Sequence, residues 1–413
     1  MPALPPLPPR VRALARRFLG DLPVEVAVLA AVAFSVAVGF GIVAPAIPVF
    51  AREFGVTRTA ASAVVSAFAF MRLVSALGGG RLVDRLGERV VLATGIGIVA
   101  VSSALAGLAQ NYAQLLVLRG VGGIGSAMFT VSAISLVLRV AAPELRGRAT
   151  GLFQAGFLVG GVTGPAFGGF LAEVSLRLPF FVYAATLAVA GSIAMLFLTR
   201  AELAEKEADG TAPQRTSLGE ALRHRAYRAA LVGNLGVGWA LFGVRMAVIP
   251  LFVVEGLDLG AKWVGIGFVV SSAAQGLLLL PAGRVADTVG RRPAMILGGT
   301  VSSVAMVLLA LSTSAPLYVV AMVLFGSGSA FLGVAPGAVV GDVVSGRGGT
   351  TVAFYQMAAD FGAVVGPLLA GLLADEVSYG AAFASTAVVL AAGALMGVRM
   401  PETRGRSRGT PAT

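Results

Sequence analysis

Long apolar runs separated by short polar segments make up most of the chain. Each run has about 20 residues or more, which is the length that an α-helix needs to cross the hydrocarbon core of a bilayer. The pattern predicts an all-α membrane protein with six helices on either side of a polar stretch at 200–228. The twelve runs lie at 24–50, 59–79, 91–109, 113–138, 149–170, 179–199, 229–254, 262–281, 293–312, 316–341, 350–373 and 380–398.

Two charged segments have the same spacing of residues. The first is G-R-L-V-D-R-L-G-E-R at 80–89, and the second is G-R-V-A-D-T-V-G-R-R at 283–292, so that matching positions are 203 residues apart. The chain is therefore two similar halves, and we predict each segment to be a short loop between two membrane helices. The predicted divisions are a cytoplasmic arm at 1–23, a first half at 24–199, a linker at 200–228, a second half at 229–398 and a cytoplasmic tail at 399–413.

The segment at 80–89 has the form G-x-L-x-D-R-x-G-x-R. It resembles the signature loop of the major facilitator superfamily, and the segment at 283–292 resembles a weaker copy. The resemblance covers about 24–398 and implies the fold of that family, in which two six-helix halves rock about a central substrate site. It also implies a gating loop in each half, made of Gly80, Asp84, Arg85, Gly87 and Arg89 in the first and of Gly283, Asp287, Gly290 and Arg292 in the second.

Asp84 is the central residue of this implied gate. By the resemblance, its carboxylate caps the cytoplasmic start of the eleventh helix, near Gly349 and Thr350, where the helix dipole favours an anion. The cap would hold the halves together on the cytoplasmic side, while Gly80 permits close approach of the helices. The second copy has Thr288 in place of the arginine after the aspartate, so its latch is expected to be weaker.

The fifth run carries a glycine-rich pattern, G-F-L-V-G-G-V-T-G-P-A-F-G-G at 156–169. Glycines spaced by four residues share one helix face and permit close packing, while the proline bends the helix. The pattern is similar to the motif typical of the drug:proton antiporter branch, which implies export, and the packing would seal the interface between the halves. Its residues are Gly160, Gly164, Pro165, Gly168 and Gly169, and the second half repeats part of it at Gly366 and Pro367.

Four ionisable side chains lie well within the runs, where a charge is costly and therefore indicates function. They are Arg72, Arg119, Arg245 and Asp360. Arg119 precedes G-V-G-G-I-G, which resembles the fourth-span motif of the family. The same letters fit a dinucleotide fingerprint, but that motif needs a strand before it and a helix start after it, and here it lies inside an apolar run.

The second and eleventh spans face each other across the halves in this family. At about 1.5 Å per residue, Arg72 and Asp360 lie about 12 and 15 Å from the cytoplasmic side, so we predict an ion pair between the halves. Its breaking, by protonation of Asp360 or by arrival of substrate, would accompany alternating access; a permanent structural pair is the alternative. Asp360 is the best candidate for the proton site because it is the one acid in the middle of a run.

The charge of the substrate stays open. Many drug:proton antiporters have an acid in the middle of the first span, whereas here Glu25 lies at its margin. Three arginines against one aspartate suit an anionic or zwitterionic substrate, although the branch suggests lipophilic cations. Side chains that could line a cavity are Gln154, Asn234, Trp239, Gln275, Tyr355 and Gln356.

Composition agrees with a membrane chain, because 57% of the residues are hydrophobic and 12% charged, with a mean hydropathy of +0.89. Cysteine is absent, which excludes disulfides and thiolate metal sites. The net charge of +11 reflects topology, with no need for a nucleic-acid partner, because most of the lysines and arginines fall on one side. The exceptions are Arg52, Arg58, Arg177 and Lys262 on the other side and the three intramembrane arginines.

The sequence therefore predicts a monomeric, proton-coupled exporter of small amphipathic compounds in the bacterial cytoplasmic membrane, with both termini in the cytoplasm and no cofactor. An importer of a metabolite and a membrane sensor that does not transport are the alternatives. An enzyme is disfavoured because no metal cluster, nucleophile elbow or phosphate loop occurs in a suitable context. In the linker, Ser217 and Glu220 form an S-x-x-E capping box that opens a basic surface helix.

Overall fold

The computed structural model describes residues 22–141, 145–197, 217–344 and 349–403. The predicted arm and most of the predicted linker and tail therefore lie outside the described residues. Within the described part, twelve helical spans are long and apolar enough to cross a membrane, and no strand occurs. The predicted all-α architecture is confirmed.

The first half contains α2 (Val24–Val43), α3 (Ala46–Arg52), α4 (Arg58–Leu86), α5 (Glu88–Gly107), α6 (Tyr112–Val140), α7 (Arg146–Val174) and α8 (Leu178–Phe197). The second half begins with the short helix α9 (Leu218–Arg223), which the predicted Ser217–Glu220 capping box opens. The rest of that half contains α10 (Arg225–Val237), η2 (Gly238–Val244), α11 (Arg245–Leu251), η3 (Phe252–Gly256), α12 (Ala261–Thr288), α13 (Arg291–Ala310), α14 (Ala315–Val343), α15 (Gly349–Glu376) and α16 (Tyr379–Arg399).

The first span of each half departs from a regular α-helix. In the first half, a turn at Ala44 and Pro45 separates α2 from α3. In the second half, the π-helical segments η2 and η3 interrupt the span without breaking it. Such irregular turns weaken a helix locally, so both spans can bend near the middle of the molecule.

The predicted loops at 80–89 and 283–292 are almost entirely helical, which corrects the sequence-based boundaries. Helix α4 continues to Leu86 and α12 to Thr288, so both helices extend beyond the apolar runs. A glycine makes the turn in each case, Gly87 with φ +79° and Gly290 with φ +145°. The change from apolar to polar residues indicates where the membrane ends. The helix itself continues until a glycine adopts a backbone conformation that is not helical.

The glycine face of α7 packs against α2 of the same half. A Cβ atom on Gly160, Gly164 or Gly168 would collide with backbone carbonyl oxygens of α2. The second half repeats this arrangement, with Gly362 and Gly366 against Leu235 and Trp239. Gly160, Gly164 and Gly168 therefore join two helices within a half and do not seal the interface between halves, whereas Gly169 of the same motif packs on Gly265 of the other half.

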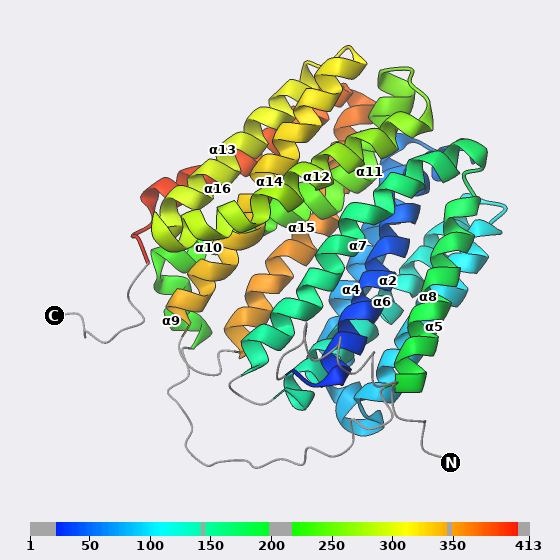
Figure 1. The fold of residues 1–413 in the computed structure, drawn as a ribbon. Helices are drawn as coiled ribbons and strands as arrows, with labels where there is room; N and C mark the ends of the chain where they lie inside the picture. The colour runs from blue at the N-terminus through cyan, green and yellow to red at the C-terminus, as the bar shows by residue number, and fades with distance from the viewer. Residues whose placement is uncertain (1–21, 142–144, 198–216, 345–348, 404–413) are drawn as a thin grey trace.

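The interface between the halves is formed by α4 against α15 and by α7 against α12. Figure 1 shows the first bundle on the right and the second on the left, with α7 and α15 between them. Close contacts across the interface include Gly169 against Gly265 and Gly371 against Ser62. We call the end of the molecule that carries α9 the linker end, and the opposite end, where α3 ends and α4 begins, the distal end.

Candidate functional site

An ion pair joins the two halves in the middle of the interface. Arg72 on α4 donates through Nη2 to Oδ1 of Asp360 on α15. The Asp360 side chain is 16% exposed and the Arg72 side chain 36% exposed, so the carboxylate is the more withdrawn member of the pair. Toward the distal end, Ser66 Oγ donates to the carbonyl oxygen of Val364 at 2.7 Å, again across the interface. The structure thus contains the pairing that the sequence predicted.

Arg119 is buried inside the first half next to that pair. Its Cζ lies 4.6 Å from the centroid of the Phe68 ring, and its Nε has no hydrogen-bond partner among the described residues. Phe68 lies on α4 between Ser66 and Arg72, both of which bond to α15. Phe40 stands 6.1 Å from Phe68, centroid to centroid. Arg119 is therefore enclosed by an aromatic layer behind the interface.

Arg245 occupies a similar environment in the second half. Its Cζ lies 4.8 Å from the centroid of the Phe268 ring on α12, and its Nε also lacks a partner among the described residues. Its Nη2 donates to Ser272 Oγ at 2.8 Å and to the Phe268 carbonyl oxygen at 3.3 Å. Each half thus buries an arginine against a phenylalanine of its own second helix.

Two carboxylates close the distal end by capping helices of the opposite half. Asp375, in the last turn of α15, accepts from the backbone amides of Arg58 at 2.9 Å and Thr59 at 2.7 Å, and from Thr59 Oγ1 at 2.6 Å. Glu173, in the last turn of α7, accepts from the amide of Lys262 at 3.2 Å. Amides in a first helical turn have no partner within the helix, so a carboxylate there is favourable.

We call these two contacts the distal clasps. The capping residues Glu173 and Asp375 stand 202 residues apart, which is also the spacing of Pro165 and Pro367. In each clasp, the fifth helix of one half caps the second helix of the other. The two halves therefore hold each other by two corresponding caps, with three hydrogen bonds to Asp375 and one to Glu173.

Glu255 adds a third connection at the distal end. Its carboxylate accepts from Arg52 Nε at 2.6 Å, Arg58 Nε at 2.9 Å and Tyr379 Oη at 2.9 Å. Arg58 also stacks over the Tyr379 ring at 4.6 Å and donates to the carbonyl oxygen of Ala374 at 2.7 Å. Sequence reasoning missed this network and the clasps. The sequence signal that could have indicated this network is the position of Arg52 and Arg58, which lie apart from most of the other basic residues.

The first gating loop is only partly described. Gly80, Asp84, Gly349 and Thr350 lie outside the residues whose side chains are described, so the predicted cap by Asp84 stays a proposal. Arg85 is exposed, and Arg89 Nη2 donates at 2.8 Å to the carbonyl oxygen of a residue of α8.

The second gating loop holds together helices of its own half. Asp287 pairs with Arg291 one turn later, and Arg291 Nε donates to Asp342 at 3.0 Å. The Asp287 side chain is 71% exposed, so it does not act as a latch to the other half in this structure. Gly283 has open space where a Cβ would be placed, so close helix approach is not its role here.

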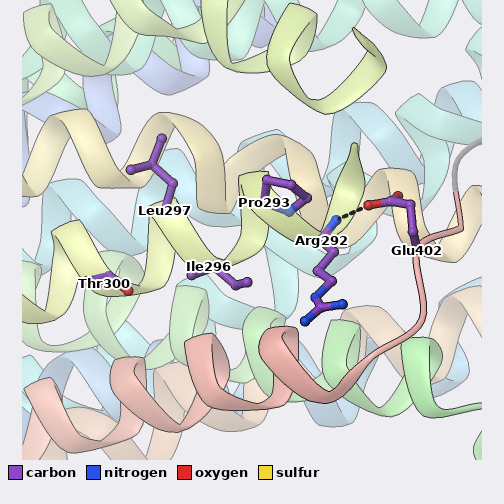
Figure 2. A pocket seen from close by; sticks show the side chains of 6 residues that line it. All are labelled: Arg292, Pro293, Ile296, Leu297, Thr300 and Glu402. Carbon is purple, nitrogen blue, oxygen red and sulfur yellow. Dashed lines mark hydrogen bonds between the residues drawn. The ribbon is translucent and has the colours of Figure 1, made fainter. Parts of the chain in front are cut away.

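Arg292 lies at the linker end of α13, away from the interface. Figure 2 shows its backbone nitrogen donating to Glu402, at 3.1 Å, beside an apolar groove along α13. Glu402 also accepts from the amide of Arg291 at 2.8 Å and so caps α13. A Cβ atom on Gly290 would collide with the Glu402 carboxylate. Packing as well as the φ angle therefore favours glycine at this position.

Two of the six predicted cavity side chains have packing roles instead. Asn234 Nδ2 donates to the Tyr355 carbonyl oxygen at 2.7 Å, and Trp239 Nε1 donates to Thr386 Oγ1 at 3.3 Å; both Asn234 and Trp239 are buried within the second half. Burial and satisfied donors leave neither free to meet a substrate in this state. The other four are half-buried or exposed: Gln154, Gln275, Tyr355 and Gln356.

The chain belongs to the Major Facilitator Superfamily, whose family model matches residues 29–274 and 244–413. It is 33% identical over 164 residues to Multidrug resistance protein 1 of Bacillus subtilis, and 30% identical over 148 residues to Quinolone resistance protein NorA of Staphylococcus aureus. These matches cover 40% and 36% of this chain, and 42% and 38% of the relatives, so they span about two fifths of each relative's length.

Solved transporters share the fold at low sequence identity. A bacterial homologue of the human lysosomal transporter Spinster, in an inward-facing and occupied conformation, superposes with a TM-score of 0.72 at 16% identity, covering 94% of this chain and 98% of that one. A POT family transporter superposes with a TM-score of 0.77 at 11% identity, covering 91% of this chain and 96% of that one. The family match and these superpositions confirm the predicted major facilitator fold. The family is one of transporters and not of enzymes.

Proposed function

We propose that this protein is a secondary active transporter that exports small amphipathic compounds in exchange for protons. It works as a monomer in the bacterial cytoplasmic membrane, with the linker end facing the cytoplasm. The names of the multidrug and quinolone resistance relatives support export. The one-sided distribution of lysines and arginines supports the orientation.

The observation that carries the proposal is the location of the contacts between halves. Ion pairs and side-chain hydrogen bonds across the interface occur at the distal clasps, at Glu255, at Ser66 and at the Arg72–Asp360 pair. Closure at one end by separable polar contacts is the arrangement of an inward-facing state in an alternating-access cycle.

Asp360 is the proposed coupling residue. Protonation removes its charge and leaves Arg72 without a counter-ion at the interface, which favours separation of α4 from α15. Deprotonation restores the pair and returns the closed contact. A proton taken up and later released at this carboxylate would link each change of conformation to the proton gradient.

The test is transport into everted membrane vesicles under an imposed pH gradient, over a panel of cationic dyes and organic anions. We expect gradient-dependent uptake by wild type, loss of this uptake in Asp360→Asn, and normal uptake in Glu376→Gln, which alters an exposed acid at the end of the same helix. Uptake without a gradient would contradict proton coupling. Movement in the opposite direction would replace the exporter by an importer.

A further inference from the structure

Two buried arginines have no acidic partner among the described residues. Arg119 is 3% exposed and Arg245 is 5% exposed, yet neither forms an ion pair with a described residue. Asp360, the acid in the middle of a span, is already paired with Arg72. The described interior therefore carries two positive charges that the protein itself does not balance.

Both arginines lie directly behind the interface between halves. Phe68, which covers Arg119, belongs to the stretch of α4 whose Ser66 and Arg72 bond to α15. Phe268, which covers Arg245, follows Gly265 by one turn, and Gly265 packs on α7 of the other half. Each guanidinium thus stacks on a phenylalanine of a helix that takes part in the interface.

The aromatic contacts do not compensate these charges. A cation over a phenylalanine gains about 0.5 to 2 kcal/mol, whereas burial of an ion costs several kcal/mol even after relaxation of its surroundings. The unpartnered Nε atoms show that hydrogen bonding is incomplete as well. Uncompensated cations in a low-dielectric wall give the adjoining interface a positive potential, which attracts anions and repels cations.

We infer that the compounds transported by this protein carry a carboxylate, with zwitterions included. Carboxylates match the planar donor set of a guanidinium, and such charge-assisted bonds are stronger than neutral ones. Purely cationic compounds would be poor substrates. The inference rests on the proposed export function and specifies its substrate class.

A matched pair of dyes tests this substrate class in everted vesicles. Rhodamine B has a free carboxylate, and rhodamine B ethyl ester has the same cationic ring system with the carboxylate blocked. We expect gradient-dependent uptake of rhodamine B to exceed that of the ester by about tenfold or more, as one charge-assisted hydrogen bond allows. Equal or faster uptake of the ester would overturn the inference while leaving the export function intact.

Variants connect the preference to the two arginines. Arg119→Gln and Arg245→Gln are expected to lower rhodamine B uptake by about tenfold each, whereas Arg245→Lys, which keeps the charge, should retain more of it. Arg177→Gln is the matched control, because Arg177 also stacks on a phenylalanine, at 5.0 Å from Phe50, but at the distal end. Unchanged rhodamine B uptake in both glutamine variants would contradict the inference.

The outcomes separate this inference from the function on which it rests. If cations of the panel are exported while rhodamine B and the organic anions are not, the carboxylate preference is wrong and export stands. If no compound of the panel moves under either direction of the gradient, the proposed export function fails, and the substrate class fails with it.

Discussion

Gly87 and Gly290 make the same turn in different surroundings. Both have φ and ψ values that glycine alone adopts readily, at +79° and 151° for Gly87 and at +145° and 162° for Gly290. Gly87 faces open space, whereas Gly290 faces the Glu402 carboxylate. One residue type therefore meets a backbone requirement in the first half and a backbone and packing requirement in the second.

Alanine substitutions should separate these requirements. Gly87→Ala is expected to destabilise the protein by about 1–3 kcal/mol because of backbone strain alone, and Gly290→Ala should cost more because Glu402 must also move. Thermal unfolding in detergent measures both. Gly283→Ala is the control; this glycine lies inside α12 with open space around it, so its melting temperature should be equal or slightly higher.

Packing of α2 on α7 requires glycine along one whole face of α7. Gly164→Ala would drive its new methyl group into the Val38 carbonyl oxygen, so we expect a loss of about 1–3 kcal/mol from overpacking. Gly161→Ala, on the open side of the same helix, should be neutral or stabilising. Melting temperatures of the Gly164→Ala and Gly161→Ala variants in detergent test this expectation. Equal values would show that α2 and α7 can move apart without loss of stability.

The distal clasps predict a shift between conformations. Asp375→Ala or Glu173→Ala removes a cap worth about 0.5–2 kcal/mol. The equilibrium between closed and open distal ends should shift toward the open form, by about tenfold if the loss is about 1.4 kcal/mol. Because the chain lacks cysteine, spin labels on Gln110→Cys and Thr313→Cys report the distance between halves at this end. Glu376→Ala removes the exposed acid next to Asp375 and should leave the distance distribution unchanged.

Helix α9 should respond to pH. Hydrogen bonds from the amide and hydroxyl of Ser217 hold the pKa of Glu220 below its usual range. The stabilisation by this carboxylate is therefore present above the usual pKa and is lost as the pH falls through the lowered one. Amide hydrogen exchange over 218–223, corrected for intrinsic rates, should accelerate at acid pH in wild type, and Glu220→Ala should abolish that dependence.

At the scale of the whole molecule, contacts across the interface should hold the halves together without a covalent link. We expect polypeptides 1–208 and 209–413, expressed together, to purify as a complex. Combining Glu173→Ala in the first with Asp375→Ala in the second should lower recovery of the complex by about tenfold or more, because two caps are lost. Undiminished recovery would show that apolar packing alone is sufficient.

The sequence predicted the spans, the two halves and the Arg72–Asp360 pair, because hydrophobic runs and repeated spacing are local signals. It failed where the outcome depends on long-range placement. Asp375 meets Arg58 across 317 positions of the chain, and no local pattern relates them. Likewise, the glycine face of α7 could have packed on any neighbour, and only the assembled bundle decides that α2 is the partner.

The distal clasps also bear on how such a chain could have arisen. Each half provides both parts of the contact, an acid at the end of its fifth helix and open amides at the start of its second. Two copies of a single six-helix ancestor, related by a twofold axis, would have formed both clasps from one kind of surface. In such a duplication only a linker would need to be added, and the dimer interface would become the interface between the halves.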